Sequence, residues 1–216
     1  MSRLATSFVL GFHGCDQSVA KQAIDGKIEL IQSNKDYDWL GPGVYFWESD
    51  PRRAAEFAQE KHALGDFKNP TVIGAVIDLR NCFDLTTRSD IAFLGDVYKA
   101  FKKVRKEASL PLPENKKASR GSHSQADRVV RLLDCAVIRH AHQVVDNTET
   151  LKGQKAEPFD TVRGLFVEGR PAYPGAGFKT KTHVQIAVRN TYCILGLFWP
   201  RPDPMTEISP SGRWPP

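Results

Sequence analysis

Two segments near the N-terminus combine residue types that can hold a flat polar molecule. An apolar run over residues 8–12 ends in His13 and Gly14, which predicts a buried strand leading into a turn. Further along, a Gly/Pro bend at residues 41–43 precedes Tyr45 in a run of aromatic residues. A glycine lets main-chain N–H and C=O groups reach a ligand, and a tyrosine ring can stack on a flat group.

The C-terminal third supplies further polar side chains for such a site. A strand predicted over residues 182–189 carries His183 and Gln185, which face the same side because side chains alternate along a strand. Glu168 follows a strand predicted over residues 161–167, and a carboxylate there can support positive charge that develops in a reaction. Each of these residues also has a purely structural interpretation, for Glu168 that of a solvent-exposed strand end.

The loop over residues 169–181 places Tyr173 and Phe178 among Arg170, Lys179 and Lys181. Aromatic rings between cations suit a nucleobase beside phosphates, and they also suit many protein side chains. We therefore interpret Tyr173 and Phe178 as candidate substrate-stacking residues, with His183 as a further candidate for the pocket.

The elements that must position these residues follow from hydrophobic periodicity and capping signals. A helix begins at Asp50 and Pro51, because aspartate caps free N–H groups and proline suits the first turn, and it carries Phe57. A central strand is predicted over residues 71–79 and a strand at the C-terminal side over residues 193–199. The remaining predicted helices cover residues 18–24, a long helix capped by Ser89 and ended by Pro111 and Pro113, and residues 126–145 with Val129, Leu133, Val137, His140 and Val144 on its buried stripe.

Strands at both ends of the chain with helices between them predict an α+β fold with a split sheet. One domain over residues 1–199 is expected, with a basic helical and loop insertion at about residues 88–150, followed by a proline-rich tail over residues 200–216. The absence of a run of about 18 apolar residues and of a secretory signal predicts a cytoplasmic protein that does not enter membranes. The four cysteines lack paired spacing, which argues against a metal site and favours buried thiols.

Charge is distributed unevenly along the chain, whose formal net charge is +5. Between Lys99 and Arg131 stand ten lysines and arginines against three acids, whereas the rest of the chain is slightly acidic. A basic segment can attract nucleic acid, an acidic protein or the phosphates of a cofactor, and it can also be a solvated helix face.

The order of these motifs resembles that of the ADP-ribosyltransferase superfamily. Within it, the sequence resembles the His-Tyr-Glu clade, which includes diphtheria toxin and poly(ADP-ribose) polymerases, and in that clade the bacterial toxin-like and phage-defence members. The resemblance rests on Phe12-His13-Gly14, on Gly41-x-Gly43-Val44-Tyr45-Phe46, on the helix over residues 53–57 and on the late strand Thr182–Asn190. Residues 74–85 resemble the next core strand of that family. The resemblance touches most of residues 8–199 and omits the basic middle.

The resemblance implies a role for each residue of the N-terminal motifs in binding NAD. His13 would donate to an adenosine-ribose hydroxyl, and the main chain of Gly14 would hold the nicotinamide carboxamide. Tyr45 would stack on the nicotinamide, with Phe57 on its other side. The family's serine contact has no direct equivalent, because the helix offers alanines and Ser49 stands some residues earlier.

The late strand carries Gln185 where the family places its glutamate. An amide supplies a neutral hydrogen bond, whereas a carboxylate also stabilises the positively charged sugar. Three explanations stay open: Gln185 suffices for transfer of a single ADP-ribose, Glu168 supplies the charge, or the protein binds NAD without cleaving it. We favour the first.

These observations predict a mono-ADP-ribosyltransferase that uses NAD as co-substrate, without a metal, and modifies a macromolecule. The basic segment and the aromatic loop favour nucleic acid over protein as the acceptor. The alternatives are an NAD glycohydrolase and a non-catalytic module that binds NAD or ADP-ribose. A toxic transferase would also need an inhibitory partner protein, which no residue identifies.

Overall fold

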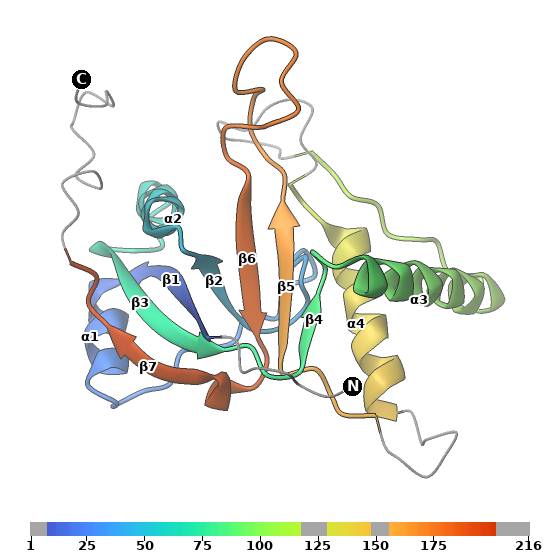
Figure 1. Ribbon diagram of the computed structural model, residues 1–216, viewed down its shortest axis with the longest axis horizontal. Coiled ribbons are helices and arrows are strands. Elements are labelled where there is room, and N and C mark those ends of the chain that lie inside the picture. Colours follow the sequence, from blue (N-terminus) through green and yellow to red (C-terminus); the bar gives the residue numbers. More distant parts are fainter. Residues whose placement is uncertain (1–7, 118–128, 148–155, 202–216) are drawn as a thin grey trace.

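The computed structural model describes residues 8–117, 129–147 and 156–201. Within these ranges the chain forms a mixed α+β fold with one seven-stranded sheet and four α-helices (Figure 1), which confirms the predicted α+β class. The predicted proline-rich tail lies outside the described residues from residue 202 onward. The same holds for residues 118–128 of the predicted basic insertion.

The strands occur in the order β4-β5-β6-β2-β1-β3-β7, and all neighbours are antiparallel except β4 and β5. Their bounds are β1 Phe8–Asp16, β2 Val44–Glu48, β3 Pro70–Asp78, β4 Cys82–Asp84, β5 Thr161–Phe166, β6 His183–Val188 and β7 Ile194–Phe198. The helices are α1 Gln17–Ile24, α2 Pro51–Ala63, α3 Arg88–Glu107 and α4 Leu132–Asn147.

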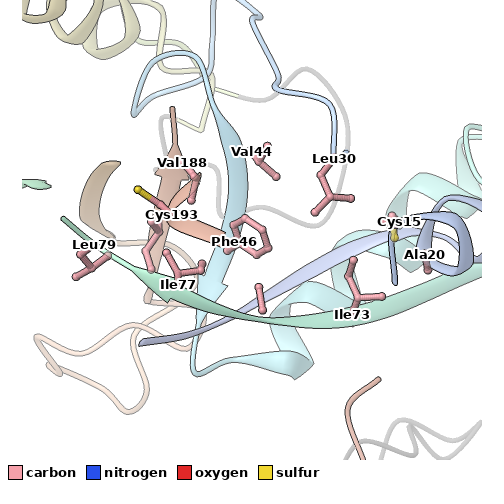
Figure 2. Close-up of a cluster of buried hydrophobic side chains, with 13 residues drawn as sticks. Cys15, Ala20, Leu30, Val44, Phe46, Ile73, Ile77, Leu79, Val188 and Cys193 are labelled. Atoms are coloured by element: carbon pink, nitrogen blue, oxygen red, sulfur yellow. The ribbon is translucent and has the colours of Figure 1, made fainter. Parts of the chain in front are cut away.

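Alternation along β2 divides the core between the two faces of the sheet. Val44 and Phe46 pack with residues of β3, β6 and helix α1 in the cluster that Figure 2 shows. Tyr45 joins the opposite face, where α3 and α4 pack, and Trp47 joins the packing of α2 against β1 and β3. Helix α1 thus covers one face, and α2, α3 and α4 share the other.

Side-chain caps fix the starts of the helices that flank the sheet. Asp50 accepts a hydrogen bond from the N–H of Arg53 (2.8 Å) and Pro51 occupies the first turn, as predicted for α2. The predicted cap of α3 is wrong by two residues. Thr87, and not Ser89, is the N-cap, because the turn after β4 orients its hydroxyl towards the N–H of Asp90.

Helix α4 differs from its prediction in both bounds and buried face. It begins at Leu132 rather than at residue 126, and it buries Cys135, Ile138, Ala141 and His142 together with Val137. Val144 of the predicted stripe is 38% exposed. The buried face differs from the predicted one because α4 lies against the turn at Gly41. A side chain added at Gly41 would collide with Ile138 and crowd His142, so these two residues of α4 face the turn.

The strand predicted over residues 71–79 is confirmed as β3, whereas residues 74–85, which the resemblance implied to form one core strand, are interrupted. β3 ends at Asp78, and β4 is a separate short strand that pairs in parallel with β5. The break lies at Arg80, whose φ of 45° is left-handed and cannot continue a strand. This turn moves the chain from β3, the neighbour of the edge strand β7, to β4 at the opposite edge of the sheet.

β1 and β2 pair only at Gly11 with Glu48 and at Phe12 with Trp47. Beyond Phe12 the two strands part, while β1 stays paired with β3 as far as Asp16. His13 is the first residue of β1 beyond this pairing, and its side chain spans the opening to the main chain of Tyr45.

Candidate functional site

A lateral row of paired residues crosses four strands of the sheet. Phe12 on β1 pairs with Trp47 on β2, which pairs with Gln185 on β6, which pairs with Gly164 on β5. Cross-strand partners lie on the same face of a sheet, so Phe12, Trp47 and Gln185 share one surface. This is the face that α2 and α4 cover on either side.

Gln185 is held by Trp39, a residue of the segment before β2. The indole Nε1–H of Trp39 donates to Oε1 of Gln185 at 2.6 Å. An indole nitrogen can only donate, which assigns Oε1 to this bond and leaves the amide NH₂ of Gln185 as a donor with no acceptor shown among the described residues. Gly164 provides the room for Trp39, because a side chain at residue 164 would collide with the indole ring.

His183 lies two residues before Gln185 on the same face, as predicted. Its ring stacks on Phe166 (5.4 Å between centroids) and lies 6.3 Å from the ring of Trp47. Its Nδ1 bonds the carbonyl oxygen of Lys181 (2.7 Å), and burial lowers the pKa of His183 below its usual value. The neutral imidazole therefore donates through Nδ1 and presents a lone pair at Nε2.

Glu168 is 2% exposed, which excludes the interpretation as a solvent-exposed strand end. Its carboxylate lies 3.7 Å from Nη2 of Arg53, a residue of α2 that is itself 8% exposed. The Arg53 guanidinium also lies over the ring of Trp47, at 5.7 Å from the centroid. A buried charge requires such partners, because removing an ion from water without them is costly.

These side chains form one unit, which we call the aromatic–polar cluster. It comprises Trp39, Trp47, Arg53, Phe166, Glu168, His183 and Gln185.

Several polar atoms of the cluster are buried without a hydrogen-bond partner among the described residues: Nε1 of Trp47, Nε and Nη1 of Arg53, and Nε2 of His183. Buried polar groups are nearly always satisfied in folded proteins. The cluster thus has donors and one lone pair left over for a polar group that the described part of the chain does not provide.

His13 does not enter the aromatic–polar cluster. Its ring packs against Phe46 on the opposite face (5.6 Å), and its Nδ1 bonds the carbonyl oxygen of Tyr45 at 2.8 Å. Burial lowers the pKa of His13, so the ring is neutral and its single N–H is used by this carbonyl. With this tautomer Nε2 of His13 accepts a hydrogen bond, so in the ribose contact implied by the resemblance the ribose hydroxyl would be the donor.

The hydroxyl of Tyr45 has a structural task. It donates to the carbonyl oxygen of Gly41 (2.8 Å) and accepts from the N–H of Leu40 (3.0 Å), which closes the turn before β2. Burial raises the pKa of Tyr45 far above its usual value. The ring packs with the cluster of apolar side chains beneath α3 and α4, so Tyr45 and His13 point to opposite faces and are joined through the main chain of Tyr45.

Three further predicted residues lie around α2. Gly14 is buried beneath this helix, and a side chain there would collide with the carbonyl oxygen of Ala54. Phe57 packs its ring on Trp47 at 5.1 Å between centroids, next to the aromatic–polar cluster. Ser49 is an exposed turn residue with φ of 53° whose N–H donates to Leu10, and the structure does not bring it into the cluster.

The predicted substrate residues of the β5–β6 loop lie on an extension of these two strands that projects from the sheet (Figure 1). A short hairpin is closed by the bridge between Pro171 and Lys179 and by a bond from the N–H of Ala172 to the carbonyl of Phe178. Tyr173 and Phe178 are 58% and 74% exposed, so both rings are available to a partner.

Two cavities in the described part of the chain lie away from the predicted site residues. One, of about 550 Å³, is lined by residues such as Gln32, Phe159 and Arg189. The other, of about 430 Å³, lies beside α3 and α4 and includes Trp39. The described residues contain no grouping of three or more His, Cys, Asp or Glu side chains that could hold a metal ion. No helix among them is long and apolar enough to cross a bilayer.

Comparisons of the chain with models of protein families, with curated proteins and with solved structures found no match.

Four members of the aromatic–polar cluster were given no role of their own from the sequence: Trp39, Trp47, Arg53 and Phe166. Trp47 had a detectable signal, because it alternates with Phe46 and so faces the same side as Tyr45. No sequence signal identified Trp39 or Arg53. Trp39, before a turn, reaches Gln185 only through tertiary packing, and Arg53, on a helix, reaches Glu168 in the same way.

Proposed function

We propose that the protein binds NAD and transfers its ADP-ribose to a macromolecular acceptor, releasing nicotinamide, as a mono-ADP-ribosyltransferase. The observation that carries this proposal is the adjacency of β1, β2 and β6. It joins His13 to Tyr45 by a hydrogen bond and sets Gln185 in the row that begins at Phe12. An ADP-ribosyltransferase fold with a split sheet is part of the proposal.

The nicotinamide end of NAD would enter where β1 and β2 part. Phe57 and Trp47 offer aromatic surface beside α2, and Tyr45, whose ring packs beneath α3 and α4, would order the main chain of β2 at this opening through its hydroxyl. The Nε2 lone pair of His13 would accept a hydrogen bond from a ribose hydroxyl. Rigid aromatic groups lower the entropic cost of orienting the substrate.

The reaction breaks the bond between the nicotinamide nitrogen and C1′ of the ribose, and the electron pair leaves with nicotinamide. A nucleophilic oxygen or nitrogen of the acceptor then bonds to C1′ and loses its proton. The free NH₂ of Gln185 would hold the ribose, while Glu168 is the carboxylate of the cluster that can stabilise positive charge on the sugar.

Nucleic acid is the acceptor class that we favour. Tyr173 and Phe178 project from the sheet between Arg170, Lys179 and Lys181, which is the combination that stacks on bases and contacts phosphates. The excess of positive charge between Lys99 and Arg131 would add long-range attraction.

The test is incubation of the protein with NAD labelled in its adenosine part, together with separate pools of RNA, DNA and protein. Nicotinamide release and label on one pool are expected. Gln185→Ala should lower kcat/KM for NAD at least about tenfold, because one ribose contact is lost. Gln185→Glu keeps an acceptor for Trp39 and adds a charge near the sugar, so its rate should equal or exceed that of the wild type.

Gln22→Ala is the matched control, since this glutamine is exposed on α1 and far from the site in the fold. Release of free ADP-ribose alone would identify an NAD glycohydrolase instead. Thermal stabilisation by NAD without nicotinamide release would identify a binding module, and no response to NAD would refute the proposal.

A further inference from the structure

A cavity of about 430 Å³ separates the outer helices from the edge of the sheet. α3 and α4 form one wall, and β5 with the residue after β4 forms the other. Its volume falls within the range typical of small-molecule sites, about 300–1,000 Å³. None of the candidate site residues named from the sequence lines it.

The lining of this cavity is mainly apolar, and part of it is left exposed to water. Ile91 on α3 and Leu165 on β5 are each 51% exposed, and both border the cavity together with the rings of Trp39 and Tyr98. Large apolar side chains around a cavity gain about 25 cal/mol for each Å² that a ligand removes from water. An apolar molecule with a flat ring fits this lining.

The charges at the cavity are already paired, which argues for an uncharged ligand. Arg131 donates to one carboxylate oxygen of Asp134 at 2.9 Å, and Asn115 donates to the other at 2.7 Å. Nε of Arg131 is buried, because the guanidinium lies over the ring of Phe166 at 4.8 Å, and it finds no acceptor among the described residues, so a ligand reaches it only when this side chain shifts towards the cavity. One hydrogen-bond donor therefore remains for a ligand that carries an acceptor such as a carbonyl oxygen.

Trp39 connects the cavity with the aromatic–polar cluster. The same indole that borders the cavity donates to Gln185 at 2.6 Å and packs edge-on against Phe166 at 5.1 Å. A molecule in the cavity would press on this ring and so act on the position of the Gln185 amide.

We propose that this cavity is a binding site for a small, uncharged aromatic molecule with a carbonyl-type acceptor, which bonds Nε of Arg131. The ring of the ligand lies against Trp39 and Tyr98, and its acceptor points to the start of α4. Binding itself is independent of the proposed transferase activity. The effect of the ligand on Gln185, and through it on NAD turnover, rests on that function.

Gly95 provides the decisive variant. It lines the cavity from α3, and a Cβ added there meets no atom within 4 Å. Gly95→Leu should fill the cavity while stabilising α3, because leucine is a better helix former than glycine by about 0.8 kcal/mol. Gly95→Ala is the matched control, since it gains the same helix propensity and leaves most of the cavity open.

Binding is measured without NAD, by calorimetry and ligand-detected NMR, with 2-acetylnaphthalene and with 2-ethylnaphthalene, which lacks the acceptor. The ketone should bind wild type and Gly95→Ala at least about fivefold more tightly than the hydrocarbon, as one net hydrogen bond implies. Gly95→Leu should weaken both ligands more than tenfold. Arg131→Lys, which keeps the charge without Nε, should remove the preference for the ketone.

Absence of binding to the wild type, or equal binding to Gly95→Leu, would overturn the site. Binding without a preference for the ketone would overturn the assigned ligand class. A response of nicotinamide release to the ketone in wild type, lost in Gly95→Leu, would establish the link to Gln185. Loss of NAD turnover as a whole would leave the binding result intact, so the two proposals fail separately.

Discussion

At the scale of single residues, His13 and His183 use their rings in the same way. Each donates its Nδ1–H to a main-chain carbonyl, that of Tyr45 or that of Lys181, and burial lowers each pKa. Neutral rings with a fixed tautomer present Nε2 as an acceptor on two faces of the sheet. The chemistry open to them is acceptance of a proton or hydrogen bond, and not donation.

A third histidine, His142 on α4, makes stability depend on pH. It is 4% exposed, and neither ring nitrogen has a partner among the described residues. Burial, aided by Arg189 and Arg139, lowers its pKa to about 3. The pKa of an unfolded histidine is about 6.5. At pH values between 6.5 and the lowered pKa, the unfolded chain binds a proton at His142 that the folded chain does not, so the free energy of unfolding falls as pH falls.

Replacing His142→Leu should therefore leave stability at pH 7 equal or higher, because two unpaired nitrogens leave the core. It should also remove up to about 1.4 kcal/mol per pH unit from the acid dependence between pH 6 and pH 4. Urea unfolding at both pH values measures this. His62→Gln, at an exposed site, is the control and should leave the change of the free energy of unfolding with pH as in the wild type. An unchanged pH dependence in His142→Leu would contradict the assignment of this dependence to His142.

The Tyr45 hydroxyl should matter more for stability than for ligand stacking. Tyr45→Phe leaves the N–H of Leu40 and the carbonyl of Gly41 without their partner, which should cost about 1–3 kcal/mol of the free energy of unfolding. The aromatic ring remains, so NAD affinity should fall less than in Tyr45→Ala. Comparison of unfolding curves with NAD titrations of both variants decides between these roles.

At the scale of elements, the contact of α2 with β1 depends on the absence of a side chain at Gly14. The helix approaches so closely that a Cβ would meet the carbonyl oxygen of Ala54. This contact sets how Arg53 and Phe57 reach the aromatic–polar cluster. α2 is therefore a positioning element for the candidate site.

Gly14→Ala should force α2 away from β1 and lower the free energy of unfolding by about 1–3 kcal/mol, the range for overpacked cores. Gly177→Ala is its control in the β5–β6 loop, where an added Cβ meets nothing within 4 Å. That change should stay within about 0.5 kcal/mol, as expected of surface positions. Chemical denaturation of the two variants gives the comparison, and equal stabilities would disprove the close contact.

At the scale of the whole molecule, the sheet and the outer helices differ in how firmly they are anchored. β1 pairs with β3 over its full length, and each of these strands has a neighbouring strand on both sides. α3 is longer than either strand, yet among its residues only Val97 is fully buried, and the cavity lies beneath it. Elements with few buried contacts open locally before the fold unfolds as a whole.

Hydrogen exchange should therefore be slowest in β1 and β3 and faster by at least about tenfold in α3, whose opening needs less free energy. Mass spectrometry of peptides from the three elements measures this under native conditions. Protection of α3 equal to that of β1 would mean that the outer helices unfold only with the sheet. Gly95→Leu should raise the protection of α3 selectively, because it fills the cavity beneath this helix.

The sequence by itself determined the α+β class, the start of α2 at Asp50 and Pro51, and the alternation that sets His183 and Gln185 on one face. These are local properties, because caps and periodicity act over a few residues. The resemblance also implied Phe57 near the pocket, and in the structure its ring packs on Trp47.

Only the tertiary structure decided the rest. The separation of β4 from β3, the buried face of α4, the tautomer of His13 and the contacts of Trp39 with Gln185 and of Arg53 with Glu168 join residues far apart in the chain. Their partners are fixed by how helices pack on the sheet, which no local pattern encodes. Chain order alone therefore indicated a pocket near His13 and Tyr45, whereas packing placed the unsatisfied polar atoms around Trp47, Arg53 and His183.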